Sequence, residues 1–530
     1  MPKNKKTKKM KIKNTLSILI MLLISQVSLS QIDNNLVELD EIVLSIPFSQ
    51  TLGKSVIKVD KINFNEINPI IKQYISKSIS RLPGVSIITT GPNIAKPSVR
   101  GLSFNRVLIY SQGVRLENQQ WGEEHGIGLS SSGAQSVEVV KGPLYVLYGS
   151  DAMGGVVYIE PENYLDSDGL SVDYTGIYNS NYNGLNNNLG LSGRSGKFSY
   201  LLRADLIDND NFSTPDNEIE NTWFEQTDIK AGINYESEKF TSDLRYSITD
   251  SDIGIPHMDE DHDDHGHDDH DDHDDHEEEG HDDHDDHEED AHYQEIKHST
   301  LTWQNTFDLG NNHTLDITLG NQINERKEFG GHEEEGHDDH DDHDDHEEEG
   351  HDDHDDHDDH GGHGDGEAEL DMELITNTLD IKLFMPQNED FNMIIGANLL
   401  DQTNKNFGFE KLVPNSEMND FGLFGLAEFR MDNNSQVLAG LRYDSRSISS
   451  GSISNDYSNF NGSLGIKKDF SNSTLRFNLS SGFRAPNLIE LFADGVHHGT
   501  FQYKKGNPNL VAEKSLQTDV SLQILSLIHI

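Results

Sequence analysis

The sequence predicts an all-β transmembrane barrel preceded by a smaller α+β domain. From Gly169 onward, segments of about ten residues alternate between apolar and polar side chains and are separated by turns, as in membrane-spanning β-strands. Beyond the first thirty residues, no stretch approaches the roughly eighteen apolar residues that a membrane-spanning helix needs. Upstream, residues 138–160 read as two short strands around a glycine-rich segment. We therefore expect the smaller domain at 51–162 and the barrel at 163–530.

Residues 1–30 have the pattern of a signal peptide. Seven lysines within the first thirteen residues precede an apolar run from Leu16 to Ile24, and small residues stand before Gln31. A membrane anchor is the alternative, but this run is too short to cross about 30 Å of hydrocarbon. The chain has no cysteine, which fits an exported protein and excludes both a disulfide framework and thiolate metal sites.

The formal net charge of −54 is concentrated in two inserts. Residues 257–292 hold 21 acidic residues and residues 332–363 hold 18, with no Lys or Arg in either span. The rest of the chain has 55 acidic against 40 basic residues, an ordinary balance for this length. Because this excess of negative charge would repel a polyanion, nucleic-acid binding is excluded as a function.

Histidine gathers in the same two inserts, with 11 and 10 of the chain's 27 histidines. The unit EEEGHDDHDDH begins at Glu277, Glu333 and Glu347 and has nothing apolar to bury, so no packed structure is expected. A solvated acidic loop would explain the carboxylates but not a His at nearly every third position. Imidazole and carboxylate together favour Zn²⁺, with Ni²⁺ and Cu²⁺ close behind. The candidate ligands are His262, His265, His267, His270, His273, His276, His281, His284, His287, His337, His340, His343, His346, His351, His354, His357 and His360.

Connector lengths predict which end of the barrel carries these tracts. In the sequence, one longer connector lies between each two consecutive short connectors. Because antiparallel strands cross the membrane in alternate directions, all short connectors should lie at one end of the barrel and all longer ones at the other. Barrels of this kind keep short turns in the periplasm. The tract loops, 251–296 and 329–367, are therefore expected to be extracellular. The short connectors are expected at 194–197, 236–239, 310–313, 385–390, 432–435 and 469–473.

Several motifs carry a family resemblance. Residues 70–82 have the apolar spacing of a helix that ends at Pro83-Gly84. The motifs LPGVSI (82–87), PSVRGLSFNRVLIY (97–110) and EVVKGPLYVLYGSDAMGGVVYIE (138–160) follow, and FRAPNLIELF (483–492) lies downstream. Over about residues 39–525 the chain closely resembles the TonB-dependent outer-membrane receptors.

That resemblance implies a 22-stranded barrel in the outer membrane of a Gram-negative bacterium, with an N-terminal α+β plug domain in its lumen. We count about fourteen strands, so it implies a C-terminally truncated copy. It also implies contact with outer-membrane lipid. No Ser/His/Asp constellation, P-loop or dinucleotide fingerprint is present, so we expect no enzyme and no required cofactor.

The resemblance further implies a coupling segment. Within residues 31–50, Asp40, Glu41, Ile42, Val43 and Leu44 stand where this family carries the TonB box. That box pairs as an added strand with the periplasmic transducer TonB, which an inner-membrane motor drives. A plain edge strand is the alternative. Plug and box are expected on the periplasmic side.

Two short stretches resemble the zinc-uptake members of the family, which have His-rich extracellular loops. Glu124 and His125 lie in QQWGEEHG, where such receptors carry a plug loop that faces the substrate; imidazole and carboxylate suit Zn²⁺ without thiolates. His497 lies in DGVHH, with Val496 where those members usually have Pro. A solvated turn and a surface histidine are the respective alternatives. Our hypothesis is that Glu124, His125 and His497 form a discrete transfer site.

These features together predict active uptake of a divalent transition metal, zinc first, with the tracts capturing metal at the surface. Two alternatives stay open. One is a receptor for haem or a metal chelate whose loops buffer metal. The other is a passive surface metal-binding protein that never transports.

Overall fold

The computed structural model describes residues 45, 48, 55–68, 75–91, 94–117, 128–141, 145–256, 292–330, 368–385, 390–408, 412–497 and 502–524. The predicted signal peptide, the TonB box, Glu124, His125 and the candidate histidines of both tracts lie outside these residues. Within the described part, no helix is long and apolar enough to cross a bilayer.

The N-terminal domain is built on a five-stranded sheet of order β1-β6-β7-β4-β5. β6 and β7 pair antiparallel, which confirms the two strands predicted at the ends of residues 138–160. The short helix between them was not predicted. The sheet strands are β1 (Val59–Asn63), β4 (Val107–Ser111), β5 (Val114–Arg115), β6 (Ala134–Val140) and β7 (Gly155–Pro161); β2 (Val85–Gly91) and β3 (Ile94–Val99) form a separate hairpin; the helices are η1 (Phe64–Glu66), α3 (Ile75–Ile79), η2 (Phe104–Arg106) and α4 (Tyr145–Tyr148).

The core of this domain comes from residues that the apolar patterns mark. Val137 and Val139 of β6 pack with Val157 and Ile159 of β7, and Ile79 of α3 belongs to the same buried cluster. α3 covers Ile75–Ile79 of the helix predicted at 70–82, whose residues 70–74 lie outside the described part. The apolar spacing thus identified a face that the domain does bury.

Gly155, the first residue of β7, occupies a position that only glycine fits. Its φ is +136°, a conformation that side chains rarely adopt, and an added Cβ would lie 2.5 Å from the carbonyl oxygen of Val140. Any larger residue would push β6 and β7 apart.

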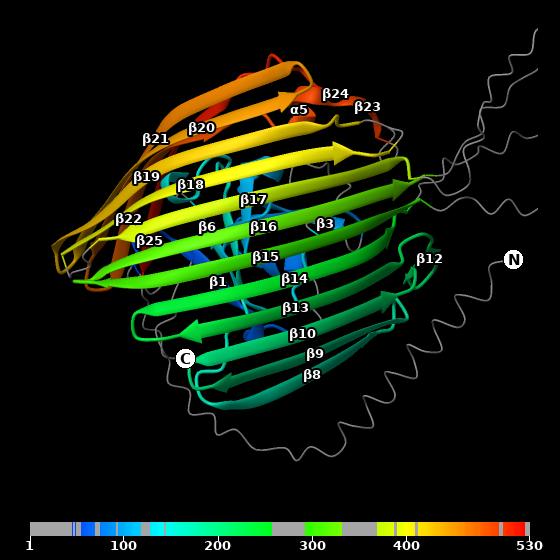
Figure 1. Cartoon of the computed structure of the whole chain (residues 1–530), viewed down its shortest axis with the longest axis horizontal. Coiled ribbons are helices and arrows are strands. Elements are labelled where there is room, and N and C mark those ends of the chain that lie inside the picture. Colours follow the sequence, from blue (N-terminus) through cyan, green and yellow to red (C-terminus); the bar gives the residue numbers. More distant parts are fainter. Residues whose placement is uncertain are drawn as a thin grey trace, which may run out of the picture. The chain divides into compact units, whose positions relative to one another are not determined.

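Downstream of the N-terminal domain, fourteen of the described strands form one antiparallel sheet, which confirms the predicted count of about fourteen. Figure 1 shows them running side by side in chain order, except that the short β11–β12 and β23–β24 hairpins stand apart. The sheet strands are β8 (Gly169–Asn179), β9 (Gly184–Ser195), β10 (Phe198–Asn209), β13 (Phe224–Glu236), β14 (Phe240–Gly254), β15 (Tyr293–Gly310), β16 (His313–Phe329), β17 (Leu370–Phe384), β18 (Phe391–Asn406), β19 (Ser416–Asp432), β20 (Ser435–Ser450), β21 (Ile453–Asp469), β22 (Ser473–Arg484) and β25 (Glu513–Ile524); the remaining elements are β11 (Phe212–Ser213), β12 (Glu218–Ile219), α5 (Leu488–Phe492), β23 (Asp494–His497) and β24 (Gln502–Lys505).

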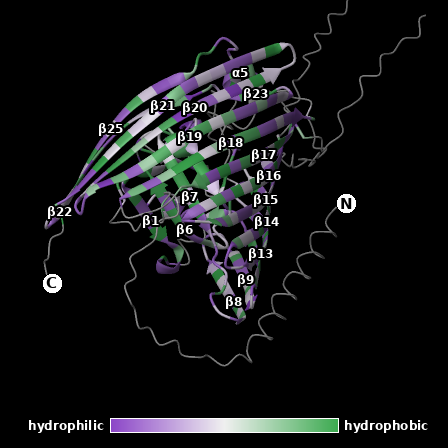
Figure 2. Ribbon diagram, turned by 60° about the vertical axis from the view of Figure 1, so that its left-hand side comes forward, coloured by the Kyte–Doolittle hydropathy of each residue, from purple (hydrophilic) through white to green (hydrophobic). Residues whose placement is uncertain are grey.

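The two faces of this sheet have opposite polarity. Along β14, Leu244 and Tyr246 are 43% and 42% exposed, whereas Ser247 and Thr249 are 8% and 6% exposed. Figure 2 shows hydrophobic and hydrophilic residues alternating along the strands in this way. Apolar residues outside and polar residues inside are the reverse of a soluble sheet and indicate a lipid-facing outer surface.

The connectors follow the predicted lengths with one exception. All six short connectors are found, but β20 and β21, expected to be joined by a longer connector, are linked by Gly451 and Ser452 alone. Gly451 has φ +58°, which suits the first position of a two-residue hairpin turn and explains this tight link. The strand order still joins β14 to β15 and β16 to β17 at one end of the sheet, opposite the six short connectors.

Candidate functional site: the ion-pair cluster between domain and barrel

The structure brings only one of the predicted transfer-site residues into the described part. The backbone of His497 ends β23 and pairs with Gln502 of β24. Val496 pairs with Tyr503, so the loop is extended at this point. Within the described ranges, no group of three or more His, Asp or Glu side chains could hold a metal ion.

A different site lies where the N-terminal domain meets the barrel wall, and Asp151 is its centre. Asp151 has φ +78°, an uncommon backbone conformation for a residue with a side chain. Its N–H donates to the carbonyl oxygen of Phe483 in β22 at 3.0 Å. The residue is 1% exposed. Such strain persists only where the surroundings over-determine it, which marks the residue as a functional candidate.

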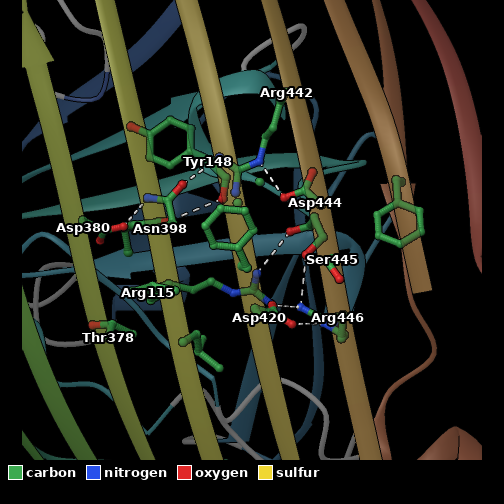
Figure 3. A pocket seen from close by; sticks show the side chains of 18 residues that line it. Arg115, Tyr148, Thr378, Asp380, Asn398, Asp420, Arg442, Asp444, Ser445 and Arg446 are labelled. Atoms are coloured by element: carbon green, nitrogen blue, oxygen red, sulfur yellow. Dashed lines mark hydrogen bonds and ion pairs between the residues drawn. The ribbon is translucent and has the colours of Figure 1, made fainter. Parts of the chain in front are cut away.

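Two arginines share the Asp151 carboxylate, one from each domain. Nη2 of Arg446, on β20, lies 2.9 Å from Oδ2, and Nη2 of Arg115, on β5, lies 2.7 Å from the same oxygen. Arg446 also pairs with Asp420 of β19 through two contacts of 2.6 Å, and Arg115 pairs with Glu117. Figure 3 shows Arg115 and Arg446 converging beside Asp420. The domain is thus fixed to the barrel by a buried, charge-assisted network.

The electrostatics of the two acids differ. Burial alone would raise the pKa of Asp151, but the guanidinium groups of Arg446 and Arg115 outweigh it and hold that pKa below its usual value. For Glu117, burial is the larger effect and raises its pKa despite the Arg115 charge. Asp151 therefore stays ionised throughout the physiological range.

Arg442 of β20 forms a second contact. Its Nε lies 2.6 Å from Asp444, and its Nη1 donates to Asn398 at 2.7 Å and to the carbonyl oxygen of Val146 at 3.4 Å. Gly149 has φ +90°, and an added Cβ would lie 2.7 Å from the guanidinium. A side chain at this position would therefore have a strained backbone and would displace the Arg442 guanidinium.

The cluster surrounds a cavity of about 50 Å³. Its lining includes Tyr110 and Tyr148 from the domain and Asp420, Arg442 and Arg446 from the barrel (Figure 3). A polar cavity of this size has room for water.

Sequence reasoning missed this site. Asp151 lies inside the quoted YGSDAMGG stretch, so a signal was present, whereas Arg446 has no local motif. The alternation of β20 gives only the inward direction of its side chain.

The family comparisons follow the same division into two parts. Residues 53–156 match the model described as "TonB-dependent Receptor Plug Domain". Residues 259–527, half of the chain, match the model described as "TonB dependent receptor-like, beta-barrel". The chain belongs to the TonB-dependent receptor family. Its N-terminal domain is the plug, and membership places the barrel in the outer membrane.

Individual relatives match shorter stretches. The chain is 29% identical over 119 residues to "Vitamin B12 transporter BtuB" of Photobacterium profundum, covering 22% of this chain and 20% of the relative. It is 40% identical over 93 residues to "Heme/hemopexin utilization protein C" of Haemophilus influenzae, covering 17% and 13%. The matched stretches thus span a fifth or less of these curated relatives.

Among solved structures, "Copper transporter OprC" aligns with a TM-score of 0.67 at 14% identity, covering 88% of this chain and 69% of that one. At this identity the likeness shows the fold alone. It supports the arrangement of plug and barrel and says nothing of cargo.

Proposed function

We propose that this protein takes up a divalent transition metal, zinc first, through TonB-dependent transport across the outer membrane. The observation that supports zinc as the cargo is the pair of inserts, which together hold 21 histidines and 39 acidic residues and no Lys or Arg. Both inserts join strands at the same end of the barrel, opposite the six short connectors. With short turns in the periplasm, the tracts stand outside and raise the local concentration of metal at the receptor mouth.

The proposed sequence of events has three steps. Metal binds the tracts, passes to a transfer site formed by Glu124, His125 and His497, and enters when TonB pulls the box at residues 40–44 and remodels the plug. Substituting Glu124, His125 and His497 together with Ala is expected to abolish saturable zinc uptake while zinc binding to whole cells persists. Unchanged uptake would exclude the transfer site.

The deciding experiment is element-resolved uptake in metal-starved cells that carry the whole protein, with and without residues 40–44. Zinc accumulation that depends on those residues supports transport. Zinc that binds at the surface equally well in both strains and never enters would contradict zinc transport and would fit either the passive surface metal-binding protein or a chelate receptor whose tracts buffer metal.

A receptor for haem or a metal chelate is the second candidate. The names of two matched relatives, a vitamin B12 transporter and a haem/hemopexin utilisation protein, favour an organic metal complex. In that case the tracts would strip or buffer metal. A competition experiment distinguishes the zinc transporter from the chelate receptor. If the cargo is zinc, free Zn²⁺ in excess blocks saturable uptake of ⁶⁵Zn. If the cargo is a chelate, free Zn²⁺ in excess leaves uptake of the chelate intact.

A further inference from the structure

Arg484, the last residue of β22, pairs with acids on both sides. Toward the loop, its Nη1 and Nη2 lie 2.7 and 2.9 Å from the two carboxylate oxygens of Glu490 in α5. Toward the barrel wall, its Nη2 lies 2.6 Å from Oε1 of Glu513, the first residue of β25. The Arg484 side chain is 4% exposed, whereas its partners Glu490 and Glu513 are 31% and 36% exposed, so the arginine is buried and the two acids are half-buried.

Glu513 extends this chain of charges into the plug. Its Oε1 accepts from Nη2 of Arg106 at 2.6 Å, and its Oε2 accepts from Nε of Arg106 at 3.1 Å. Arg106 ends η2, within the motif RGLSFNR. One carboxylate therefore holds two guanidinium groups together, one from the plug and one from the root of the α5 loop.

Backbone contacts connect α5 rigidly to the hairpin that follows it. The N–H of Asn507 donates to the carbonyl oxygen of Glu490 at 2.8 Å, and the N–H of Gly506 donates to that of Ala493 at 2.6 Å. A Cβ on Gly506 would lie 2.6 Å from the backbone of Leu491, so the two segments are in direct contact. Asn487 closes the start of α5 with a capping box. The position of α5 thus sets the position of β23, where His497 lies.

We propose that Glu513 and Arg484 are positioning residues, which fix α5, β23 and β24 (residues 488–497 and 502–505, called here the α5–β24 loop) relative to the plug through Arg106 and Glu490. The consequence for transport rests on the proposed function; the positioning itself does not. If the charge of Glu513 is removed, Arg106 and Arg484 face each other without the anion that both contact. The loop should then move away from the plug.

The chain offers a matched control on the same strand. Asp519 of β25 also pairs with a plug arginine, Arg100, but it has no contact with Arg484 or α5 among the described ion pairs and hydrogen bonds. Glu513→Gln and Asp519→Asn each remove one carboxylate from β25 that holds the plug. Only the first also releases the loop. Glu490→Gln weakens the contact between Arg484 and Glu490 and leaves the Arg106–Glu513 contact intact. It therefore tests the proposal even if Glu513→Gln does not fold.

The measurement uses a single spin label. Because the chain has no cysteine, Lys505→Cys in the exposed end of β24 gives one labelled site in the purified whole protein. We expect Glu513→Gln and Glu490→Gln each to increase the mobile fraction of the label spectrum by about threefold or more, and Asp519→Asn to leave it unchanged. A spectrum that stays unchanged in folded Glu490→Gln, or that changes equally in Asp519→Asn, would overturn the proposal.

Uptake of zinc ion gives a second readout. In Glu490→Gln, which leaves the Arg106–Glu513 contact between plug and barrel intact, a displaced loop should raise the zinc concentration for half-maximal uptake by about tenfold and leave the maximal rate unchanged. A fall in maximal rate alone would contradict positioning. If the label becomes mobile as expected in a protein that takes up no zinc, the positioning stands and the proposed cargo fails.

Discussion

The backbone N–H of Ser45 donates to Oε2 of Glu138 at 2.8 Å. Ser45 is the residue that directly follows the predicted TonB box. The carbonyl oxygen of Ser45 accepts from the hydroxyl of Tyr148. Glu138 is fully buried in β6 and pairs with Lys61 at 3.2 Å. The residue that follows the predicted TonB box is therefore attached to the plug core through two hydrogen bonds, next to α4, which packs against the barrel wall.

Tyr148→Phe should loosen this attachment selectively. Loss of one hydrogen bond costs about 1 kcal/mol, which corresponds to about a fivefold rise in the population of the open state. We expect amide hydrogen exchange at Ser45 to accelerate by that factor. Tyr110→Phe is the control, since the Tyr110 hydroxyl makes only a 3.5 Å contact with the carbonyl oxygen of Tyr148. Equal acceleration in both variants would contradict a specific role for Tyr148.

Asp151→Asn should weaken the attachment of the plug to the barrel. Removing one partner of a buried ion pair costs about 3 kcal/mol, at the low end of the range because Arg446 keeps Asp420 and Arg115 keeps Glu117. The fall in free energy of unfolding can be measured by denaturant titration of the purified protein. The exposed pair Lys405–Glu373 is the comparison, and Glu373→Gln should cost less than about 1 kcal/mol. Similar costs would mean that the Asp151 cluster does not hold the plug.

Two separate pH windows are expected. The pKa of Asp151 is lowered in the folded protein, so its contribution is complete above the ordinary carboxyl value of about 3.9 and is lost as the pH falls through the lowered pKa. Histidine, in contrast, protonates near 6.5 and then no longer binds metal. Zinc binding should therefore fall between about pH 7 and 6, while the plug stays attached at pH 5. Calorimetric zinc titration and plug protection from proteolysis, each across this pH range, measure the two. Joint loss near pH 6 would contradict the assignment.

Local patterns predicted the strands of this fold because alternation is a property of neighbouring residues. The alternation of apolar and polar residues predicted β6, β7 and a barrel of about fourteen strands. Gln112 and Gly113, both with positive φ, form the turn between β4 and β5. The cluster around Asp151 could not be predicted in this way. Asp151 and Arg446 are 295 residues apart, and many barrel positions place a polar residue inward. Which of them meets the plug depends on how two folded surfaces fit together.

Gly149→Ala tests that fit at one position. The variant must adopt φ +90° and must also place its Cβ 2.7 Å from the Arg442 guanidinium. The backbone strain alone costs about 1 kcal/mol, and displacement of Arg442 from Asn398 and Asp444 should add about 1–3 kcal/mol of lost buried hydrogen bonds. Gly196→Ala isolates the first effect, because Gly196 has φ +59° and nothing within 4 Å of its added Cβ. Denaturant titration of both variants gives the difference. If Gly149→Ala costs no more than Gly196→Ala, the contact between Arg442 and the plug backbone contributes nothing to holding the plug in place.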